Sequence, residues 1–246
     1  MDSNILLTTD PQASIPWLSL IVLLPAVGAL IMPFLPGEDK IGTNYPRNFA
    51  LTLLFIDFIL IIGVINNSFN NQLSGIQLSE RVNWIPLIGL EWSLGIDGIS
   101  APLVILSGLI TFLSAAASWK LNRKTKLYFA LLLVQASAQS LVFLSQDFLL
   151  FFLAWELELV PVYLLIAIWG GTNRQYAATK FILYTALASL LILISGLALA
   201  LSGDNFTLNL SELATRSASG NFGLLCYLGF LIGFGVKLPI FPLHTW

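Results

Sequence analysis

The stretch 147–171, DFLLFFLAWELELVPVYLLIAIWGG, is apolar over the length that a helix needs to cross a lipid bilayer. About 20 helical residues at roughly 1.5 Å each span the hydrocarbon core. Glu156 and Glu158 interrupt this stretch near its middle, and Pro161 follows them. Because a charge at that depth costs about 3 kcal/mol or more, the stretch predicts a membrane helix whose ionisable groups have a partner or a pathway.

The composition of the whole chain also indicates a membrane protein. Of the 246 residues, 57% are hydrophobic and 10% are charged, whereas a soluble domain has roughly 25% charged residues. The net charge of −2 provides no basic field, which excludes nucleic acid as a partner. Cys226, the single cysteine, cannot form an internal disulfide and is expected to be a buried packing group. The first twelve residues contain no Lys or Arg, so we expect no cleaved targeting peptide.

The fold class that we predict is all-α: a polytopic transmembrane helix bundle of about seven helices. No run shows the ten-residue alternation of a membrane β-barrel. The connection 67–98 is the longest, and its Trp and charged residues favour a hairpin or a segment lying on the extracytoplasmic surface. The apolar runs long enough to span the bilayer are residues 16–36, 48–66, 99–119, 127–144, 148–169, 177–201 and 222–246.

Basic residues are unevenly distributed among the connections between these runs. The alternate loops hold only Arg81 and Arg216. Because Lys and Arg accumulate on the cytoplasmic side, the basic-rich loops are predicted to face the cytoplasm or stroma, and the N-terminus the opposite side. The basic residues of loops 37–47, 120–126 and 170–176 and the helix starts after them are Lys40, Arg47, Lys120, Arg123, Lys124, Lys126, Arg174 and Lys180.

Glu156 is the first candidate for proton transfer. It lies eight residues after Phe148, which is about 12 Å along a helix and close to the middle of the span. Pro161 lacks the N–H that would bond the carbonyl of Leu157, so water could reach this turn. Either Glu156 exchanges protons there, or it is a permanently protonated group that is hydrogen-bonded to a neighbouring helix.

Three other acids have different predicted roles. Glu158 lies about 200° around the helix from Glu156, so at most one of the two faces the same interior as a distant lysine. The spacing does not decide which one. Asp57, in the middle of the second run, either pairs with a basic group, lines a subunit contact or has a structural role, which we favour. Asp97, in LGIDGIS, is typical of a helix N-terminal cap.

The stretch 236–246, VKLPIFPLHTW, places a lysine directly before two prolines. Pro239 and Pro242 obstruct helical hydrogen bonding, so we expect a helix broken in mid-membrane, with its freed carbonyls satisfied by water and side chains. Lys237 would lie at the break as a switchable charge. His244, the single histidine, is either a relay group that titrates near neutral pH or an ordinary hydrogen-bonding group.

Recognisable redox motifs are absent from the sequence. It contains no GxGxxG, Walker loop, CxxC, HExxH or paired histidines for haem. One cysteine and one histidine cannot hold an iron–sulfur cluster. We therefore predict that this chain binds no cofactor and no metal.

Two segments together, FFLAWELELVPVYLLIAIWGG at 151–171 and GFGVKLPIFPLHTW at 233–246, carry a family resemblance. They resemble the proton-channel subunits of complex I and of its relatives, the Mrp-type sodium/proton antiporters, and the likeness covers essentially the whole chain. It implies that Glu156 and Lys237 are the proton-handling pair and that His244 matches the histidine of the family's PLH segment. Glu158 has no matching acid in many bacterial relatives, so the resemblance implies no function for it.

The resemblance also implies a setting. The chain would be a proton-translocating subunit of an NAD(P)H or ferredoxin:plastoquinone oxidoreductase, a hetero-oligomer with other membrane subunits in a lipid bilayer. Plastoquinone, NAD(P)H or ferredoxin, and the iron–sulfur clusters would be handled by other subunits. The location would be the thylakoid membrane with a lumenal N-terminus, or alternatively the bacterial plasma membrane.

Members of this family have further helices and a second, inverted repeat. We therefore expect a truncated chain, with leading helices in residues 1–126 and part of the first repeat in residues 127–246. Three other functions stay open: a cation/proton antiporter subunit with the same Glu/Lys pair, a structural subunit that moves nothing, and direct quinone binding. The last is weakened by the missing cofactor motifs.

Overall fold

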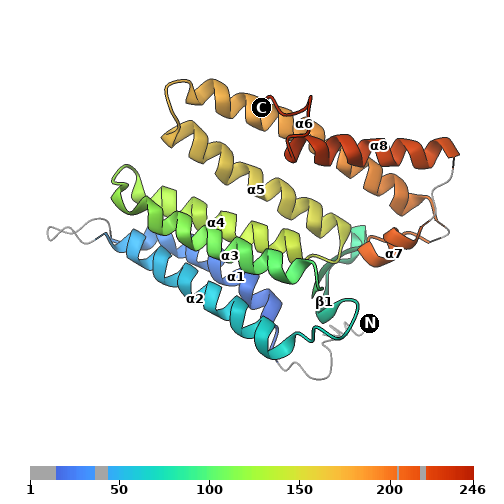
Figure 1. Ribbon diagram of the computed structural model, residues 1–246, viewed down its shortest axis with the longest axis horizontal. Helices are drawn as coiled ribbons and strands as arrows, with labels where there is room; N and C mark the ends of the chain where they lie inside the picture. Colours follow the sequence, from blue (N-terminus) through green and yellow to red (C-terminus); the bar gives the residue numbers. More distant parts are fainter. Residues whose placement is uncertain (1–14, 37–43, 204, 217–219) are drawn as a thin grey trace. The chain divides into compact units, whose positions relative to one another are not determined.

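The computed structural model describes residues 15–36, 44–203, 205–216 and 220–246. These form two compact units, drawn in Figure 1. Unit 1 extends to Ser145, except for hairpin residues 85–90, which group with unit 2, and unit 2 continues from Gln146. The first twelve residues and Lys40, on which part of the predicted orientation depends, lie outside the described residues.

The described helices confirm the predicted bundle. Each of the seven long ones is apolar and long enough to cross a membrane, so the chain is a multi-pass membrane protein. A short helix, α7 (Leu210–Thr215), precedes the last of them. The long helices are α1 (Trp17–Ile31, extended by the 3-10 turn η1, Met32–Phe34), α2 (Tyr45–Ser68), α3 (Ser100–Ala117, extended by η3, Ser118–Lys120), α4 (Thr125–Leu144), α5 (Phe148–Trp169), α6 (Arg174–Leu201) and α8 (Gly220–Lys237).

The long connection after α2 forms the hairpin that was one of its two predicted forms. Strands β1 (Gln77–Ile85) and β2 (Leu90–Ile96) pair in a two-stranded sheet, with the 3-10 turn η2 (Pro86–Ile88) between them. Gly89, which ends η2, has φ of +71°, a left-handed conformation that glycine adopts without strain.

The predicted last span, 222–246, is wrong at its end. Helix α8 ends at Lys237, and residues 238–246 form turns. Pro239 has no N–H to continue the ladder, and its ring obstructs the preceding turn, which explains the stop. Pro161, by contrast, lies inside α5, which remains helical to Trp169.

Unit 1 contains α1 to α4, and small or polar side chains allow the helices to approach closely. A Cβ on Gly28 of α1 would lie 2.7 Å from Leu53 of α2. The Ser137 hydroxyl of α4 donates a 2.7 Å hydrogen bond to the carbonyl of Val22 in α1. Because α4 packs in this way against the helices before it, the compact unit ends at Ser145. The division into leading helices and first repeat after residue 126 stays a prediction.

Basic side chains join helix ends at one end of unit 1. Arg47, at the start of α2, donates to the Trp119 carbonyl at 2.9 Å and stacks on its ring at 4.0 Å. Lys126, at the start of α4, donates to the Pro33 carbonyl at 3.4 Å. These contacts place the basic residues near 47 and 126 at the same end, as the loop charges predicted, whereas Glu80 of the hairpin contacts the opposite end of α1.

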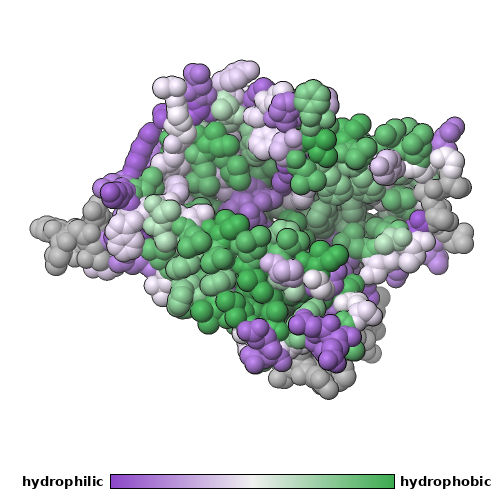
Figure 2. Space-filling model, viewed as in Figure 1, coloured by the Kyte–Doolittle hydropathy of each residue, from purple (hydrophilic) through white to green (hydrophobic). Residues whose placement is uncertain are grey.

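Along their lengths the helices expose large apolar side chains, as lipid or membrane partners require. Leu23 and Val27 of α1 and Ile110 of α3 are about half exposed. Figure 2 shows apolar (green) residues covering helix flanks and hydrophilic (purple) residues gathered mostly near helix ends.

Unit 2 contains α5, α6, α7 and α8, and glycines of α8 bring it close to α6. A Cβ on Gly233 would lie 2.4 Å from Ile192, and one on Gly229 would lie 2.0 Å from the Ser195 hydroxyl oxygen. The register is antiparallel, because later residues of α8 meet earlier residues of α6. Lys237, one turn beyond Gly233, therefore lies at the level of the middle of α6.

Candidate functional site

Lys237 forms an ion pair with Glu158 inside unit 2. Its Nζ lies 2.7 Å from Glu158 Oε2, and the two side chains are 25% and 16% exposed. The same ammonium lies 3.7 Å from the centre of the Trp155 ring. Trp155 and Glu158 are three residues apart on α5, so they share one face of that helix and both contact the ammonium.

Aromatic rings align α5 with α8 beside this ion pair. Trp155 of α5 meets Phe234 of α8 edge to face at 5.5 Å, and Phe151 lies 6.4 Å from the same ring. Phe230 stacks on Phe234 at 5.9 Å. On both helices two aromatic residues, at positions i and i+4, precede the charged residue at position i+7. The aromatic contact and the ion pair therefore lie on the same faces of α5 and α8.

The ion pair lies deep within the length of its helices. Glu158 is near the middle of α5, and Lys237 is level with the middle of α6. An ion without a partner at that depth would cost several kcal/mol of folding free energy. Lys237 is also the last residue of α8, where the negative end of the helix dipole favours a cation.

The segment after Lys237 satisfies carbonyls that the end of α8 leaves open. The Trp246 indole Nε1 donates to the Val236 carbonyl at 2.6 Å, and Ile240 N donates to the Gly235 carbonyl at 2.9 Å. This agrees with the expected use of side chains at the break. The Trp246 ring also packs on Phe181 of α6 at 5.3 Å.

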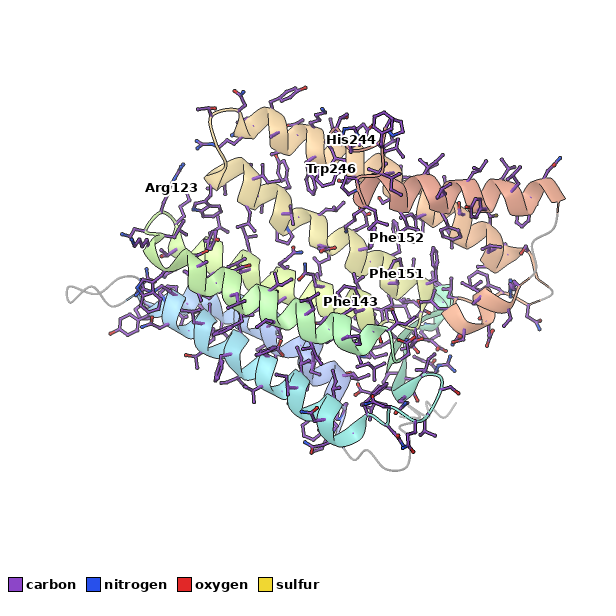
Figure 3. The ribbon with its side chains drawn as sticks, in the orientation of Figure 1. Arg123, Phe143, Phe151, Phe152, His244 and Trp246 are labelled. Atoms are coloured by element: carbon purple, nitrogen blue, oxygen red, sulfur yellow. The ribbon has the colours of Figure 1, made fainter. Side chains whose placement is uncertain are left out.

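Glu156 is not placed next to Lys237. It lines a groove between α5 and α6, and its Oε1 is buried without a hydrogen-bond partner among the described residues. Phe152, one turn earlier on α5, lines the same groove, whereas its neighbour Phe151 faces α8; Figure 3 labels both rings. The remaining lining residues belong to α6: Leu183, Ala186, Leu187, Ser189, Leu190 and Leu193.

His244 lies outside the ion pair. Its side chain is exposed, and its ring lies 5.5 Å from that of Phe241. Because α8 ends at Lys237, His244 does not follow Lys237 along a continuous helix, and helical spacing does not place these two side chains on one face. Figure 3 shows His244 close to Trp246 in the segment that follows α8.

Asp57 and Cys226, two further residues that the sequence singled out, are both buried. Asp57 of α2 is 2% exposed, and its Oδ1 has no hydrogen-bond partner within the described ranges, so no described basic group pairs with it. Cys226 is buried, as predicted. In the part of the chain that the structure describes, no group of three His, Cys, Asp or Glu residues is arranged to hold a metal ion.

Asp97 has the predicted capping role. Its Oδ1 accepts hydrogen bonds from the backbone N–H groups of Ser100 at 2.7 Å and Ile99 at 3.0 Å, where α3 begins. These bonds, that of Ser100 above all, hold the pKa of Asp97 below its ordinary value, although partial burial opposes the shift.

Sequence reasoning assigned no role to Glu158, which the structure joins to Lys237. One signal could have identified it. Phe151, Trp155 and Glu158 follow the same spacing as Phe230, Phe234 and Lys237, so two aromatic faces end in opposite charges. That shared pattern favours Glu158 over Glu156 as the residue facing Lys237.

Comparisons with known proteins agree with this architecture. Residues 145–246 match the family described as NADH:quinone oxidoreductase/Mrp antiporter, transmembrane. The chain is 56% identical over 94% of its length to NAD(P)H-quinone oxidoreductase chain 4 1 of Synechococcus elongatus, and it spans 43% of that relative's length.

Solved structures contain the same fold. A chain of the respiratory complex I from Thermus thermophilus with bound NADH matches 93% of this chain at a TM-score of 0.80 and 26% identity, over 45% of its own length. A chain of the Mrp complex from Dietzia sp. matches 93% at a TM-score of 0.75 and 19% identity, over 24% of its own length, which shows a shared fold. Residues 145–246 therefore match the NADH:quinone oxidoreductase/Mrp antiporter transmembrane family, and the chain is similar to NAD(P)H-quinone oxidoreductase chain 4 proteins over less than half of their length.

Proposed function

We propose that this chain is part of a proton-translocating membrane subunit of an NAD(P)H or ferredoxin:quinone oxidoreductase. The observation that carries the proposal is the ion pair between Lys237 and Glu158, which lies near the middle of α5 and at the C-terminal end of α8. Such a charge is costly, and proteins place one there for a pathway or a partner. The similarity to the chain 4 proteins supports the redox setting.

The mechanism follows from the cost of uncompensated charge. While a carboxylate faces it, the Lys237 ammonium is stable; when that charge is neutralised or moved away, the ammonium is driven to release its proton. Neighbouring subunits would drive the alternation, so redox energy becomes proton movement without electrons passing through this chain. Glu156 would supply protons from its groove, and His244 would be the onward relay group.

The setting belongs to the same proposal. The partners would be other membrane subunits, with NAD(P)H or ferredoxin, iron–sulfur clusters and plastoquinone handled elsewhere in the complex. The membrane would be the thylakoid or the bacterial plasma membrane. The basic end of unit 1, near Arg47 and Lys126, would face the cytoplasm, and the N-terminus the lumen.

The test is proton uptake by vesicles that carry the whole complex, with quinone reduction followed in the same sample. Glu156→Gln and Lys237→Gln are compared with wild type, and Glu212→Gln, at an exposed position of α7, is the control. We expect both variants to assemble and to take up fewer protons per electron, while the control matches wild type.

Two other results would replace the proposal. Unchanged uptake per electron in both variants would indicate a structural subunit. Proton uptake that requires sodium and proceeds without quinone reduction would indicate an antiporter subunit of the Mrp type.

A further inference from the structure

We propose that Glu158 is the direct proton partner of Lys237, and that Glu156 acts separately, on another face of α5. This rests on the proposed function and assigns within it a role that the family resemblance does not imply. The two acids would divide the work: Glu158 exchanges a proton with Lys237, while Glu156 takes up protons in the groove against α6.

The first support is contact. Glu158 Oε2 lies 2.7 Å from Lys237 Nζ, which is hydrogen-bond distance and short enough for direct proton transfer. The pair is held from both helices, because Trp155 contacts the ammonium and Phe234 packs on Trp155. A chance surface ion pair would not have this aromatic support, and its side chains would be more exposed.

The second support is the different surroundings of Glu156. Its carboxyl lies among apolar residues of the groove, with Oε1 buried and without a hydrogen-bond partner among the described residues. These surroundings differ from those of Glu158, whose carboxylate contacts the Lys237 ammonium. Because the two acids lie about 200° apart around α5, Glu156 cannot replace Glu158 at the ammonium by a change of rotamer alone.

The transfer step is balanced within the pair. An N–H bond of Lys237 Nζ breaks and an O–H bond of Glu158 Oε2 forms, so ammonium and carboxylate become amine and carboxylic acid. The pair is electrically neutral before and after the step, which avoids a lone charge in a medium of low dielectric constant. The ring of Trp155, 3.7 Å from Nζ, holds the ammonium beside Glu158.

The experiment uses the whole complex in vesicles and adds two variants to the previous series. Glu158→Gln keeps the size and an acceptor oxygen but cannot take a proton, whereas Glu158→Asp keeps a carboxyl that is one carbon shorter. We expect Glu158→Gln to lower proton uptake per electron by as much as Lys237→Gln does. Glu158→Asp should recover part of this uptake. Glu212→Gln again serves as the control, since its carboxyl is exposed on α7.

A double variant separates proton transfer from assembly. If Glu158→Gln weakens the complex because it leaves a buried ammonium uncompensated, adding Lys237→Gln should restore assembly but not proton uptake. Normal uptake in the double variant would overturn the proposal, since neither group would then be required.

The failures of the two proposals are distinguishable. If Glu156→Gln and Lys237→Gln lose uptake and Glu158→Gln does not, Glu158 is only a counter-ion and the further inference is wrong, while proton translocation stands. If none of the three variants loses uptake, the proposed function fails as well.

Discussion

The carboxylate of Glu80 in the hairpin caps the first turn of α1 through Leu18. Its Oε1 accepts a 2.7 Å hydrogen bond from the Leu18 N–H, and its Oε2 accepts bonds from Ser19 N at 2.9 Å and Ser19 Oγ at 2.5 Å. The indole Nε1 of Trp92 donates to the same hydroxyl at 2.8 Å. The hairpin thus supplies from a distance the acceptor that a helix N-terminus needs.

Glu80→Ala should loosen the start of α1. The Leu18 N–H would be left buried without its acceptor, which costs about 1–3 kcal/mol. Hydrogen–deuterium exchange of the first turn of α1 in the assembled complex should become faster. Glu91→Gln, which alters the more exposed Arg81–Glu91 pair of the same hairpin, should change it much less. Equal effects of both substitutions would contradict the cap.

The stability contributed by Asp97 should depend on pH. Because the folded-state pKa lies below the ordinary value of 3.8, the contribution is fully present above about pH 4 and is lost as the pH falls through the lower, folded value. We expect exchange at the start of α3 to differ between wild type and Asp97→Asn above that pH, and to converge in more acidic buffer. A difference that grows on acidification would have the wrong sign for a depressed carboxyl pKa.

Arg216 should hold the C-terminal end of α6. Its guanidinium donates to the carbonyls of Leu199 at 2.8 Å and Ala200 at 2.7 Å, and also to that of Asn205. Arg216→Lys removes the planar fork and should destabilise this end by about 1–3 kcal/mol, seen as faster exchange of the last turn of α6. Arg174→Gln, at the first residue of α6, should leave the last turn unchanged, since Arg174 lies at the opposite end of this 28-residue helix.

Gly233→Ala should separate α8 from α6. The added Cβ would meet Ile192 at 2.4 Å and the Ala188 carbonyl at 3.0 Å, and overpacking of this kind costs about 1–3 kcal/mol. Exchange across α8 should accelerate, and the Lys237–Glu158 pair one turn further on should weaken. Gly63→Ala in α2 is the matched control, because its Cβ would meet nothing within 4 Å. A neutral Gly233→Ala would show that α8 can shift at no cost.

The membrane helices could be predicted because the bilayer requires a certain length and an apolar composition, and both can be read from each run of the sequence without knowledge of its neighbours. The end of α8 was predicted too late, at residue 246, because apolar residues continue past Lys237 while Pro239 stops the hydrogen-bond ladder. The choice between Glu156 and Glu158 depended on which face of α5 meets α8. That choice is made by packing of Trp155 on Phe234, residues far apart in the sequence. The cap from Glu80 was likewise invisible, since it joins positions 62 residues apart.

The aromatic contact of α5 with α8 has a consequence for water. Phe151, Phe230 and Phe234 have no hydrogen-bonding groups, so a chain of hydrogen-bonded water cannot continue through their rings. These rings precede the ion pair along both helices, and the turns of residues 238–246 follow Lys237. The rings therefore insulate the ion pair on one side, so a chain of water molecules that reaches it has to come from the side of the turns.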